Sequence, residues 1–498
     1  MIYQKQYKDI NNPNNIACNS IRFIIFYAIR NLFCITFFIL LSLNNAYSKC
    51  TIVDSVPALQ TYINAASAGD TILLKNGTYT NNTISIPGAK NHLTIMPVTN
   101  GGVFLNGTNN IRITGNYNTF NGFQFTSGYT PGNVITIYGN YNILSQLNFN
   151  GYNATHMLMI EGYYNLIVNC NFQNKPATNM VTSGGTGDMV QIIPDTLNTP
   201  GYNVIRYCSF QHMPGVGGDY GNEGIRIGDS PYAKNISRTT VEYCYFEDTG
   251  LGDNEAISVK SQENCLRYNT MKNNPLAMFT FRNGDNNVAY GNFFIQSGGI
   301  RIKQANNIYC YNNYFENASS YPPVHLEYYD NTCGNNFNLI HNTFYSCSPI
   351  QIDTGMKTCT WANNIFYWDS ATIISGSING QSFMGNLYQG TIGYTITSGM
   401  TNTNPLLSLN ACGFYAISSG SPAINAAVAG YPSILDITNL NDDPTLTFDI
   451  QGQSRPYSTT LKDVGCDEYK IGPVINHPLQ LCETGPFYLC STCSCVTY

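Results

Sequence analysis

Four charged residues stand close together in a chain that is otherwise poor in charge. Asp253, Glu255, Lys260 and Arg282 fall within thirty residues, although Asp, Glu, Lys and Arg make up only 10% of the 498 residues. Carboxylate oxygens are the ligands that Ca²⁺ prefers, and cations stacked together attract an anion. The group therefore indicates a site for a divalent cation and an anionic ligand.

The spacing of Lys260 and Arg282 indicates how they are arranged. They are 22 residues apart, and each ends a short run of alternating β-type residues, AISVKS and MFTFRN. In a coiled β-structure with one turn per ~22 residues, such positions stack about 4.8 Å apart along the axis. We therefore expect the two cations to lie side by side on neighbouring turns.

The rest of the chain has the same period. From about Cys50, short β-type runs alternate with Gly, Asn and Asp, and an aromatic or apolar residue recurs mostly every 21 to 25 residues. These anchors are Phe125, Phe149, Phe172, Phe210, Phe246, Met271, Phe293, Phe315, Phe344, Phe366 and Leu387. A fixed period of this length is the signature of a solenoid, so we predict an all-β solenoid of about eleven or more turns.

Small residues recur two positions before most of these anchors. They are Cys170, Cys208, Cys244, Asn269, Asn313, Asn342 and Asn364. We expect the cysteines to stack inward as small buried apolar groups, without redox or metal chemistry. The asparagines are expected to form hydrogen bonds at a corner of the coil.

A second column consists of the outward positions of the strands, between inward apolar residues. It reads Tyr138, Glu161, Gly228, Lys260, Arg282, Lys303, Glu327 and Asp353, with Arg226, Ser258, Thr280, Arg301 and His325 two residues earlier. The basic residues gather on the middle turns, and we expect Lys260 and Arg282 to point to solvent.

Two interpretations of this basic column are open. It is either a solvated face with salt bridges to residues such as Glu161, Glu223 or Glu327, or a site over which an anion lies. Asp253 and Glu255 favour the second, because two carboxylates two residues apart at the start of a strand can point to the same side. With an oxygen from Asn222 or Glu223, they suit Ca²⁺.

The N-terminal 48 residues are expected to be a signal peptide. Arg22 and Arg30 precede the apolar run LFCITFFILLSL, which is too short for a membrane span, and AYS offers small residues at a cleavage site. We therefore expect a secreted chain with no stable membrane span. Six Asn-x-Ser/Thr acceptors fit that setting: Asn76, Asn81, Asn106, Asn153, Asn235 and Asn317.

The net charge, the C-terminal sequence and the cysteine count give three further predictions. The formal charge of −6 argues against nucleic-acid binding. We expect one solenoid over residues 49–405, a capping region over 406–470 and a cysteine-rich tail over 471–498. Of 17 cysteines, two fall in the leader, so the remaining odd number leaves at least one free or paired between chains.

Several stretches resemble one family. They are NEGIRIG (222–228), SRTTVEYCYFEDTGLGDNEAISVKSQENCLRYNT (237–270), FRNGDNNVAYGNFF (281–294) and GGIRI (298–302). They are similar to the alginate lyases and chondroitinase B, the polysaccharide lyase family 6 type. The resemblance implies a right-handed parallel β-helix that cleaves a uronic acid polysaccharide by β-elimination.

The resemblance also implies roles for individual residues. Lys260 matches the base that removes the C5 proton of a uronate, and Arg282 matches the arginine that assists the transfer. Ca²⁺ would be held by Asn222, Asp253 and Glu255 and would bind the substrate carboxylate. Arg301 matches an arginine that contacts the sugar carboxylate. The outward column adds Lys303, Arg226 and His325 as residues expected to contact the acidic polysaccharide.

The sequence departs from the family pattern beside this site. Asn283 follows Arg282 where the family usually has His, and the histidine often seen after GGIRI is missing, because KQANN occupies that region. A non-catalytic carbohydrate-binding or cell-surface protein on the same scaffold therefore stays open. The sequence does not decide between alginate and glycosaminoglycan substrates, between endo and exo cleavage, or the oligomeric state.

Overall fold

The computed structural model describes residues 48–176, 187–194, 199, 201–213, 223–250, 254–330, 333–437 and 440–469. Two of the expected calcium ligands, Asn222 and Asp253, lie outside these ranges. So do all but the last residue of the expected signal peptide and the whole cysteine-rich tail.

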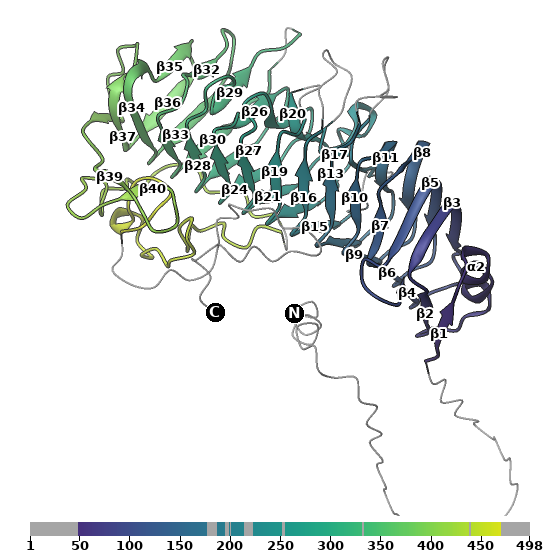
Figure 1. Ribbon diagram of the computed structural model, residues 1–498. Coiled ribbons are helices and arrows are strands. Elements are labelled where there is room, and N and C mark those ends of the chain that lie inside the picture. The colour runs from purple at the N-terminus through teal and green to yellow at the C-terminus, as the bar shows by residue number, and fades with distance from the viewer. Residues whose placement is uncertain are drawn as a thin grey trace, which may run out of the picture. The chain divides into compact units, whose positions relative to one another are not determined.

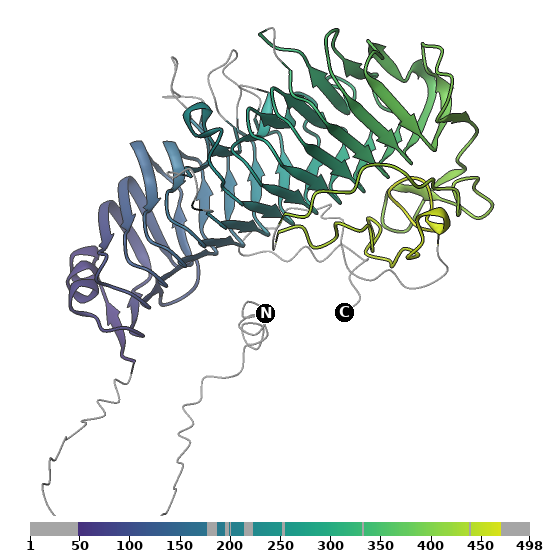
Figure 2. The same ribbon diagram turned by 180° about the vertical axis from the view of Figure 1, so that it is seen from behind.

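The described chain from Lys49 onward is a parallel β-solenoid with three faces (Figures 1 and 2). All strand pairs along its faces are parallel, and each strand pairs with its counterpart one turn earlier and one turn later. The predicted right-handed parallel β-helix is confirmed. One face alone stacks 14 strands, which agrees with a solenoid of eleven or more turns.

The first face is this 14-stranded sheet. Its strands are β1 (Cys50–Val53), β2 (Thr71–Leu74), β4 (Thr94–Pro97), β6 (Thr119–Asn121), β9 (Ile143–Ser145), β12 (Leu166–Val168), β15 (Val204–Arg206), β18 (Thr240–Glu242), β21 (Cys265–Arg267), β24 (Val288–Tyr290), β27 (Ile308–Tyr311), β30 (Phe337–Ile340), β33 (Cys359–Ala362) and β36 (Gln381–Met384).

The second face carries the aromatic anchors. Its strands are β7 (Phe123–Phe125), β10 (Asn148–Asn150), β13 (Asn171–Gln173), β16 (Ser209–Gln211), β19 (Tyr245–Glu247), β22 (Thr270–Lys272), β25 (Phe293–Ile295), β28 (Tyr314–Glu316), β31 (Thr343–Tyr345), β34 (Ile365–Thr372), β37 (Asn386–Thr391) and β38 (Met400–Asn402).

The third face carries the basic column. Its strands are β3 (Gly77–Ile86), β5 (Val103–Ile113), β8 (Gly128–Ile137), β11 (Tyr152–Ile160), β14 (Val190–Ile192), β17 (Ile225–Gly228), β20 (Glu255–Lys260), β23 (Met278–Arg282), β26 (Ile300–Lys303), β29 (Val324–Glu327), β32 (Ile350–Ile352) and β35 (Ile374–Gly376). The longest early strands bend around the corner between the second and third faces.

The core is built from the predicted anchors, with two corrections. Rings of successive turns stack face to face, for example Phe172 on Phe210 with centroids 5.1 Å apart. The inward residues on two turns are Phe294 and Tyr388, so the predictions of Phe293 and Leu387 were wrong by one position. Each true anchor adjoins a second large apolar residue, and the periodicity alone did not separate the two.

The asparagine ladder is confirmed and is longer than predicted. The Asn269 side chain donates to Oδ1 of Asn292 at 3.0 Å, and Asn292 donates to Asn313 at 3.0 Å. The ladder continues through Asn342 and Asn364 to Asn386. The one-position error at Phe293 had hidden Asn292. All eleven cysteines that the structure describes are free, and Cys170, Cys208 and Cys244 are buried in the core as predicted.

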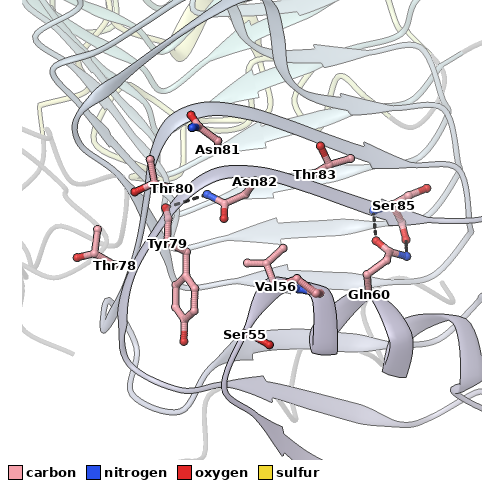
Figure 3. Close-up of a pocket in the computed structure, with 11 residues that line it drawn as sticks. Ser55, Val56, Gln60, Thr78, Tyr79, Thr80, Asn81, Asn82, Thr83 and Ser85 are labelled. Atoms are coloured by element: carbon pink, nitrogen blue, oxygen red, sulfur yellow. Dashed lines mark hydrogen bonds between the residues drawn. The ribbon is translucent and has the colours of Figure 1, made fainter.

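Helix α2 (Val56–Ala65) packs against the first turns. Its cap is Ser55, whose side chain accepts a hydrogen bond from Ala58 N, and Val56, Leu59 and Ile63 are buried. A pocket of about 790 Å³ lies between the N-terminal end of α2 and β3 (Figure 3). None of its lining residues is charged, so it is not the predicted anion site.

Residues 406–469 lie along the side of the solenoid (Figure 2). They include the antiparallel pair β39 (Leu407–Leu409) and β40 (Tyr415–Ile417), and a 3-10 helix at Thr459–Leu461; another such helix is Ser230–Tyr232. Gly465 N donates to Asn363 O at 2.8 Å, and Tyr311 donates to Asn441 at 2.7 Å. The segment therefore contacts several turns of the coil. Among the described helices, none is long and apolar enough to cross a membrane.

Candidate active site

The basic column occupies consecutive strands of the third face. Gly228 is opposite Lys260, Val259 is opposite Phe281, and Arg282 is opposite Lys303. Lys260, Arg282 and Lys303 therefore follow one another on β20, β23 and β26, as the spacing predicted. The second column is also in register, with Arg226 opposite Ser258, Thr280 opposite Arg301, and Arg301 opposite His325.

Alternation along each strand fixes these side chains on the outer surface. Ile257, Val259, Phe279 and Phe281 point inward and have no exposed surface. A glycine closes the turn beside Lys260: Gly228 has φ +83°, and an added Cβ would lie 2.3 Å from the Lys260 carbonyl oxygen. The inward residues thus fix the position of each cation along the axis of the solenoid, and Gly228 allows the close approach of the neighbouring turn.

The expectation that Lys260 points to solvent was wrong. Lys260 is 5% exposed, Lys303 6% and Arg226 3%, whereas Arg282 is intermediate. Lys260 lies 3.8 Å from the buried Glu223, and Lys303 lies 3.2 Å from Glu327. The column is therefore a dense polar layer rather than a solvated face.

On the N-terminal side, Lys260 adjoins a buried ion-pair network. Nη2 of Arg226 lies 2.7 Å from each carboxylate oxygen of Glu223, and Arg226 Nε lies 3.1 Å from Asp188 Oδ2. Lys260 Nζ is 3.8 Å from Glu223 Oε1. Burial and the neighbouring Asp188 raise the pKa of Glu223 to about 7, while Arg226 and Lys260 oppose that rise. Glu223 thus links the predicted base to this network.

Three members of the network, Asp188, Lys175 and His156, were not predicted. Lys175 donates to the carbonyl oxygens of Thr155 and Gly187, and burial lowers its pKa to about 8, although Asp188 and Glu223 favour its charged form. His156 lies beside Asp188, and burial lowers its pKa to about 3. Lys175 and Asp188 lie outside the regular strands, where no period relates them to the middle turns, whereas His156 lies within β11.

On the C-terminal side, the cations have carboxylate partners. Arg301 pairs with Glu255 Oε1, and its Nε lies 3.6 Å from Glu327. Lys303 Nζ is 3.2 Å from Glu327 Oε1. Burial lowers the pKa of Lys303, Glu327 opposes this, and Arg282 and Arg301 add to it. His325, also predicted to contact the polysaccharide, lies 3.2 Å from Asp353.

Arg282 differs from these neighbours. Within the described ranges it forms no ion pair or hydrogen bond, and its Nε is buried without an acceptor. Its guanidinium lies 5.9 Å from the ring centroid of Tyr329. The hydroxyls of Ser258 and Thr280, on the adjoining column, are also buried and have no hydrogen-bond partner in the part of the chain that the structure describes. Native proteins rarely leave such groups unsatisfied, so this cluster of donors marks a place for a ligand.

Glu255 fits the expected role of a cation ligand. Its side chain is fully buried, and while Oε1 pairs with Arg301, Oε2 has no hydrogen-bond partner among the described residues. A buried carboxylate oxygen with no donor suits a bound cation. Within the described ranges, no three His, Cys, Asp or Glu residues are grouped to hold a metal. The two other expected ligands, Asn222 and Asp253, lie outside those ranges.

Asn283 lies at a turn of the backbone. Asn283 has φ +65°, in the left-handed region, and its N–H donates to Lys303 O at 3.3 Å. Asparagine adopts this conformation more easily than most residues. The residue thus turns the chain directly after Arg282.

Comparison with known proteins agrees with this fold. The chondroitinase B family model matches residues 53–362. Among solved structures, the family 6 alginate lyase AlyGC is 23% identical with a TM-score of 0.64, covering 78% of this chain and 59% of that one. A mannuronic acid specific family 6 lyase from human gut microbiota is 21% identical with a TM-score of 0.59, covering 72% and 92%.

A third structure, the family 6 lyase Pedsa3628 from Pseudopedobacter saltans, is 21% identical with a TM-score of 0.56, covering 68% of this chain and 92% of that one. At these identities the structures show a shared fold. This chain spans 59% of the length of AlyGC. No curated protein matches significantly. Because the family model covers more than half of the sequence, the chain belongs to the chondroitinase B family, of the polysaccharide lyase family 6 type.

Proposed function

We propose that this chain is a secreted polysaccharide lyase that cleaves a uronic acid polymer by β-elimination. The observation that carries the proposal is Arg282, a cation between Lys260 and Lys303 whose buried Nε has no acceptor within the described ranges. An anionic sugar would supply the acceptor. Membership of the chondroitinase B family supports a polymer of uronates.

Two substrate classes are consistent with the comparisons. The matching family model is that of chondroitinase B, and the similar structures are described as alginate lyases. We propose alginate and chondroitin or dermatan sulfate as the first polymers to test. In both, each uronate presents a carboxylate next to the proton that is removed.

The proposed chemistry assigns separate roles to the two adjacent cations. Lys260, as the neutral amine, takes the proton from C5 of the uronate. The electron pair of that bond forms the C4–C5 double bond, the C4–oxygen bond breaks, and the leaving oxygen takes up a proton. Arg282, one turn away, assists this transfer and stabilises the developing negative charge. Glu223, held by Arg226, fixes the position of the Lys260 amine.

Calcium is proposed as the cofactor. Asn222, Asp253 and Glu255 would hold it, and the unpartnered Oε2 of Glu255 supports that assignment. When bound, the ion neutralises the substrate carboxylate and so makes the C5 proton easier to remove. Arg301 lies against Glu255 and therefore positions that carboxylate as well as facing the sugar.

The test is the ultraviolet absorbance of the unsaturated uronate that β-elimination leaves. Purified chain with calcium is expected to give a steady rise on one of alginate, chondroitin sulfate, dermatan sulfate or pectate. Chelation is expected to stop the rise, and added calcium to restore it. A rise unaffected by chelation would exclude the calcium assignment, and a flat trace on every polymer would contradict the lyase.

A second candidate function is carbohydrate binding without cleavage. Asn283 favours it, because the family usually has a histidine there, next to the catalytic arginine. A binding protein would be retained on an immobilised uronate polymer and give no absorbance change. It would also tolerate the loss of Lys260, whereas a lyase would not.

A further inference from the structure

An aromatic ring lies over two of the stacked cations. Tyr329 follows β29, and the centroid of its ring is 3.6 Å from Lys303 Nζ and 5.9 Å from the Arg282 guanidinium carbon. Tyr329 is 40% exposed, so the ring forms part of the outer surface of the site. No sequence pattern marks Tyr329, which precedes the residues at 331 and 332 that lie outside the description.

The ring faces a pair of like charges. Arg282 and Lys303 are opposite each other on adjacent parallel strands, where like charges destabilise the pair. Lys303 is compensated by Glu327 at 3.2 Å, but Arg282 has no such partner in the described part of the chain. The repulsion should push the Arg282 side chain away from the column.

A carboxylate at the position of Tyr329 would relieve this repulsion but would also neutralise the site. The face of an aromatic ring attracts a cation through its quadrupole and carries no net charge. A tyrosine can therefore hold both cations while their positive field stays available to an anionic sugar. This combination is what an arginine that must bind a substrate carboxylate requires.

We infer that Tyr329 is a positioning residue, whose ring face holds Arg282 in the column beside Lys303 and takes the place that an acidic counterion of Arg282 would have. The inference rests on the proposed lyase function for its kinetic test. The phenolic hydroxyl takes no part in it. The ring is the active element, and its role is to aim the Arg282 guanidinium at the substrate.

Three variants separate the ring from the hydroxyl and from bulk. Tyr329→Phe keeps the face, and Tyr329→Leu keeps an apolar side chain without it. We expect kcat/KM to fall about 5- to 10-fold in Tyr329→Leu, largely in kcat, and to stay within about twofold in Tyr329→Phe. Tyr328→Leu is the matched control, since the Tyr328 ring packs beside Gly355, and it should match the parent.

Opposite kinetic results would overturn the inference. If Tyr329→Phe loses as much activity as Tyr329→Leu, the hydroxyl acts, for instance as a proton donor. If Tyr329→Leu is as active as the parent, the ring positions nothing. Both results leave the lyase function intact, whereas absence of product from the parent on every polymer counts against that function alone.

An NMR measurement that needs no substrate tests the inference even if the parent forms no product on any polymer. In protein with isotope-labelled lysine, an NMR titration follows the Lys303 amine. Because the ring stabilises the charged form, the pKa of Lys303 should drop in Tyr329→Leu and stay unchanged in Tyr329→Phe. Equal pKa values of Lys303 in the parent, Tyr329→Leu and Tyr329→Phe would contradict the inference, whatever the catalytic activity.

Discussion

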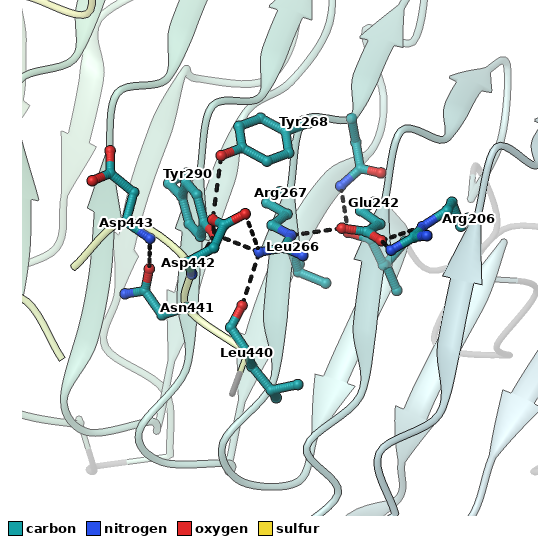
Figure 4. Close-up of polar contacts among 12 residues, drawn as sticks. Arg206, Glu242, Leu266, Arg267, Tyr268, Tyr290, Leu440, Asn441, Asp442 and Asp443 are labelled. Atoms are coloured by element: carbon teal, nitrogen blue, oxygen red, sulfur yellow. Dashed lines mark hydrogen bonds and ion pairs between the residues drawn. The ribbon is translucent and has the colours of Figure 1, made fainter. Parts of the chain in front are cut away.

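Arg267 and Arg282 lie within one turn of the coil but on different faces, and their surroundings are opposite in kind. Arg267 ends β21 and is surrounded by acceptors: Glu242 at 2.6 Å, Asp442 at 2.8 Å, the Tyr290 hydroxyl at 2.9 Å and the Leu440 carbonyl at 3.0 Å (Figure 4). Arg282 ends β23 and has no acceptor in the described part of the chain.

Under the proposed function, the contrast separates a structural arginine from a binding one. The Arg267 guanidinium joins the solenoid to residues 440–442 of the C-terminal segment, and Glu242 and Asp442 balance its charge. The charge of Arg282 has no counterion among the described residues, where the ring of Tyr329 lies beside it. In a chain with so few charges, the absence of a partner is the feature that points to function.

The largest expected effect lies on the catalytic side of this comparison. Lys260→Ala should lower the rate of elimination by about 10²- to 10⁴-fold, because it removes the base. The free energy of unfolding should change by less than about 1 kcal/mol, since Glu223 keeps its bidentate contact with Arg226.

Initial rates from ultraviolet absorbance, and urea unfolding monitored by circular dichroism, measure the two quantities. Lys234→Ala is the matched control, because Lys234 lies at the surface and pairs only with Asp285 among the described residues. A Lys260→Ala protein that keeps the parent rate would remove Lys260 from the mechanism.

Loss of Arg267 should change the stability of the protein and leave its activity nearly unchanged. Arg267→Ala should lower the free energy of unfolding by about 2–4 kcal/mol, because among the described residues it leaves the buried Glu242 with Arg206 as its remaining ion-pair partner and removes the ion pair of Asp442. Activity per folded molecule should stay within about twofold. Unchanged urea unfolding would show that the network in Figure 4 contributes little.

A smaller effect concerns the pH dependence of the C-terminal segment. Burial and the neighbouring Asp449 raise the pKa of Asp467 above its ordinary value of 3.8, and Asp463 adds to this while Gln451 and Arg455 oppose it. The folded protein therefore holds this proton after the unfolded chain has lost it. The stability contributed by Asp467 is present in acid and is lost as the pH rises through the raised pKa.

In Asp467→Asn, the free energy of unfolding should fall less steeply as the pH rises. The difference from the parent should be about 1 kcal/mol between acid and a pH above the raised pKa. The amide oxygen can still accept the hydrogen bond that Gln451 donates to Asp467 at 2.6 Å. Urea unfolding of both proteins over a pH series provides the measurement. Parallel curves would show that Asp467 carries no raised pKa, and the kinetics of the distant cation column should not change.

Much of the site followed from the sequence because a solenoid converts spacing into contact. The period placed Lys260, Arg282 and Lys303 next to one another, and alternation placed them on the outer face. Their burial was not predictable, because it depends on contacts with other side chains. Lys175, Asp188 and Tyr329 come from loops or irregular turns, where no period relates sequence distance to spatial distance.

The position of the anchors shows the same limit on a smaller scale. The doublet Phe293–Phe294 offers two large apolar residues, and only the hydrogen-bonded register shows that Phe294 points inward. Phe293 instead packs against Tyr314 on the next turn of the solenoid and against Phe414 of the C-terminal segment. The sequence could not show that contact, because it joins parts of the chain far apart in the solenoid period.

The most direct test compares the two arginines in one experiment. Parent, Arg282→Ala and Arg267→Ala proteins are given the same uronate polymer with calcium, at a temperature where all three are folded, and the absorbance of unsaturated uronate is followed. We predict product from the parent and from Arg267→Ala, and a rate at least about 100-fold lower from Arg282→Ala. Equal rates from the parent and Arg282→Ala would contradict the account.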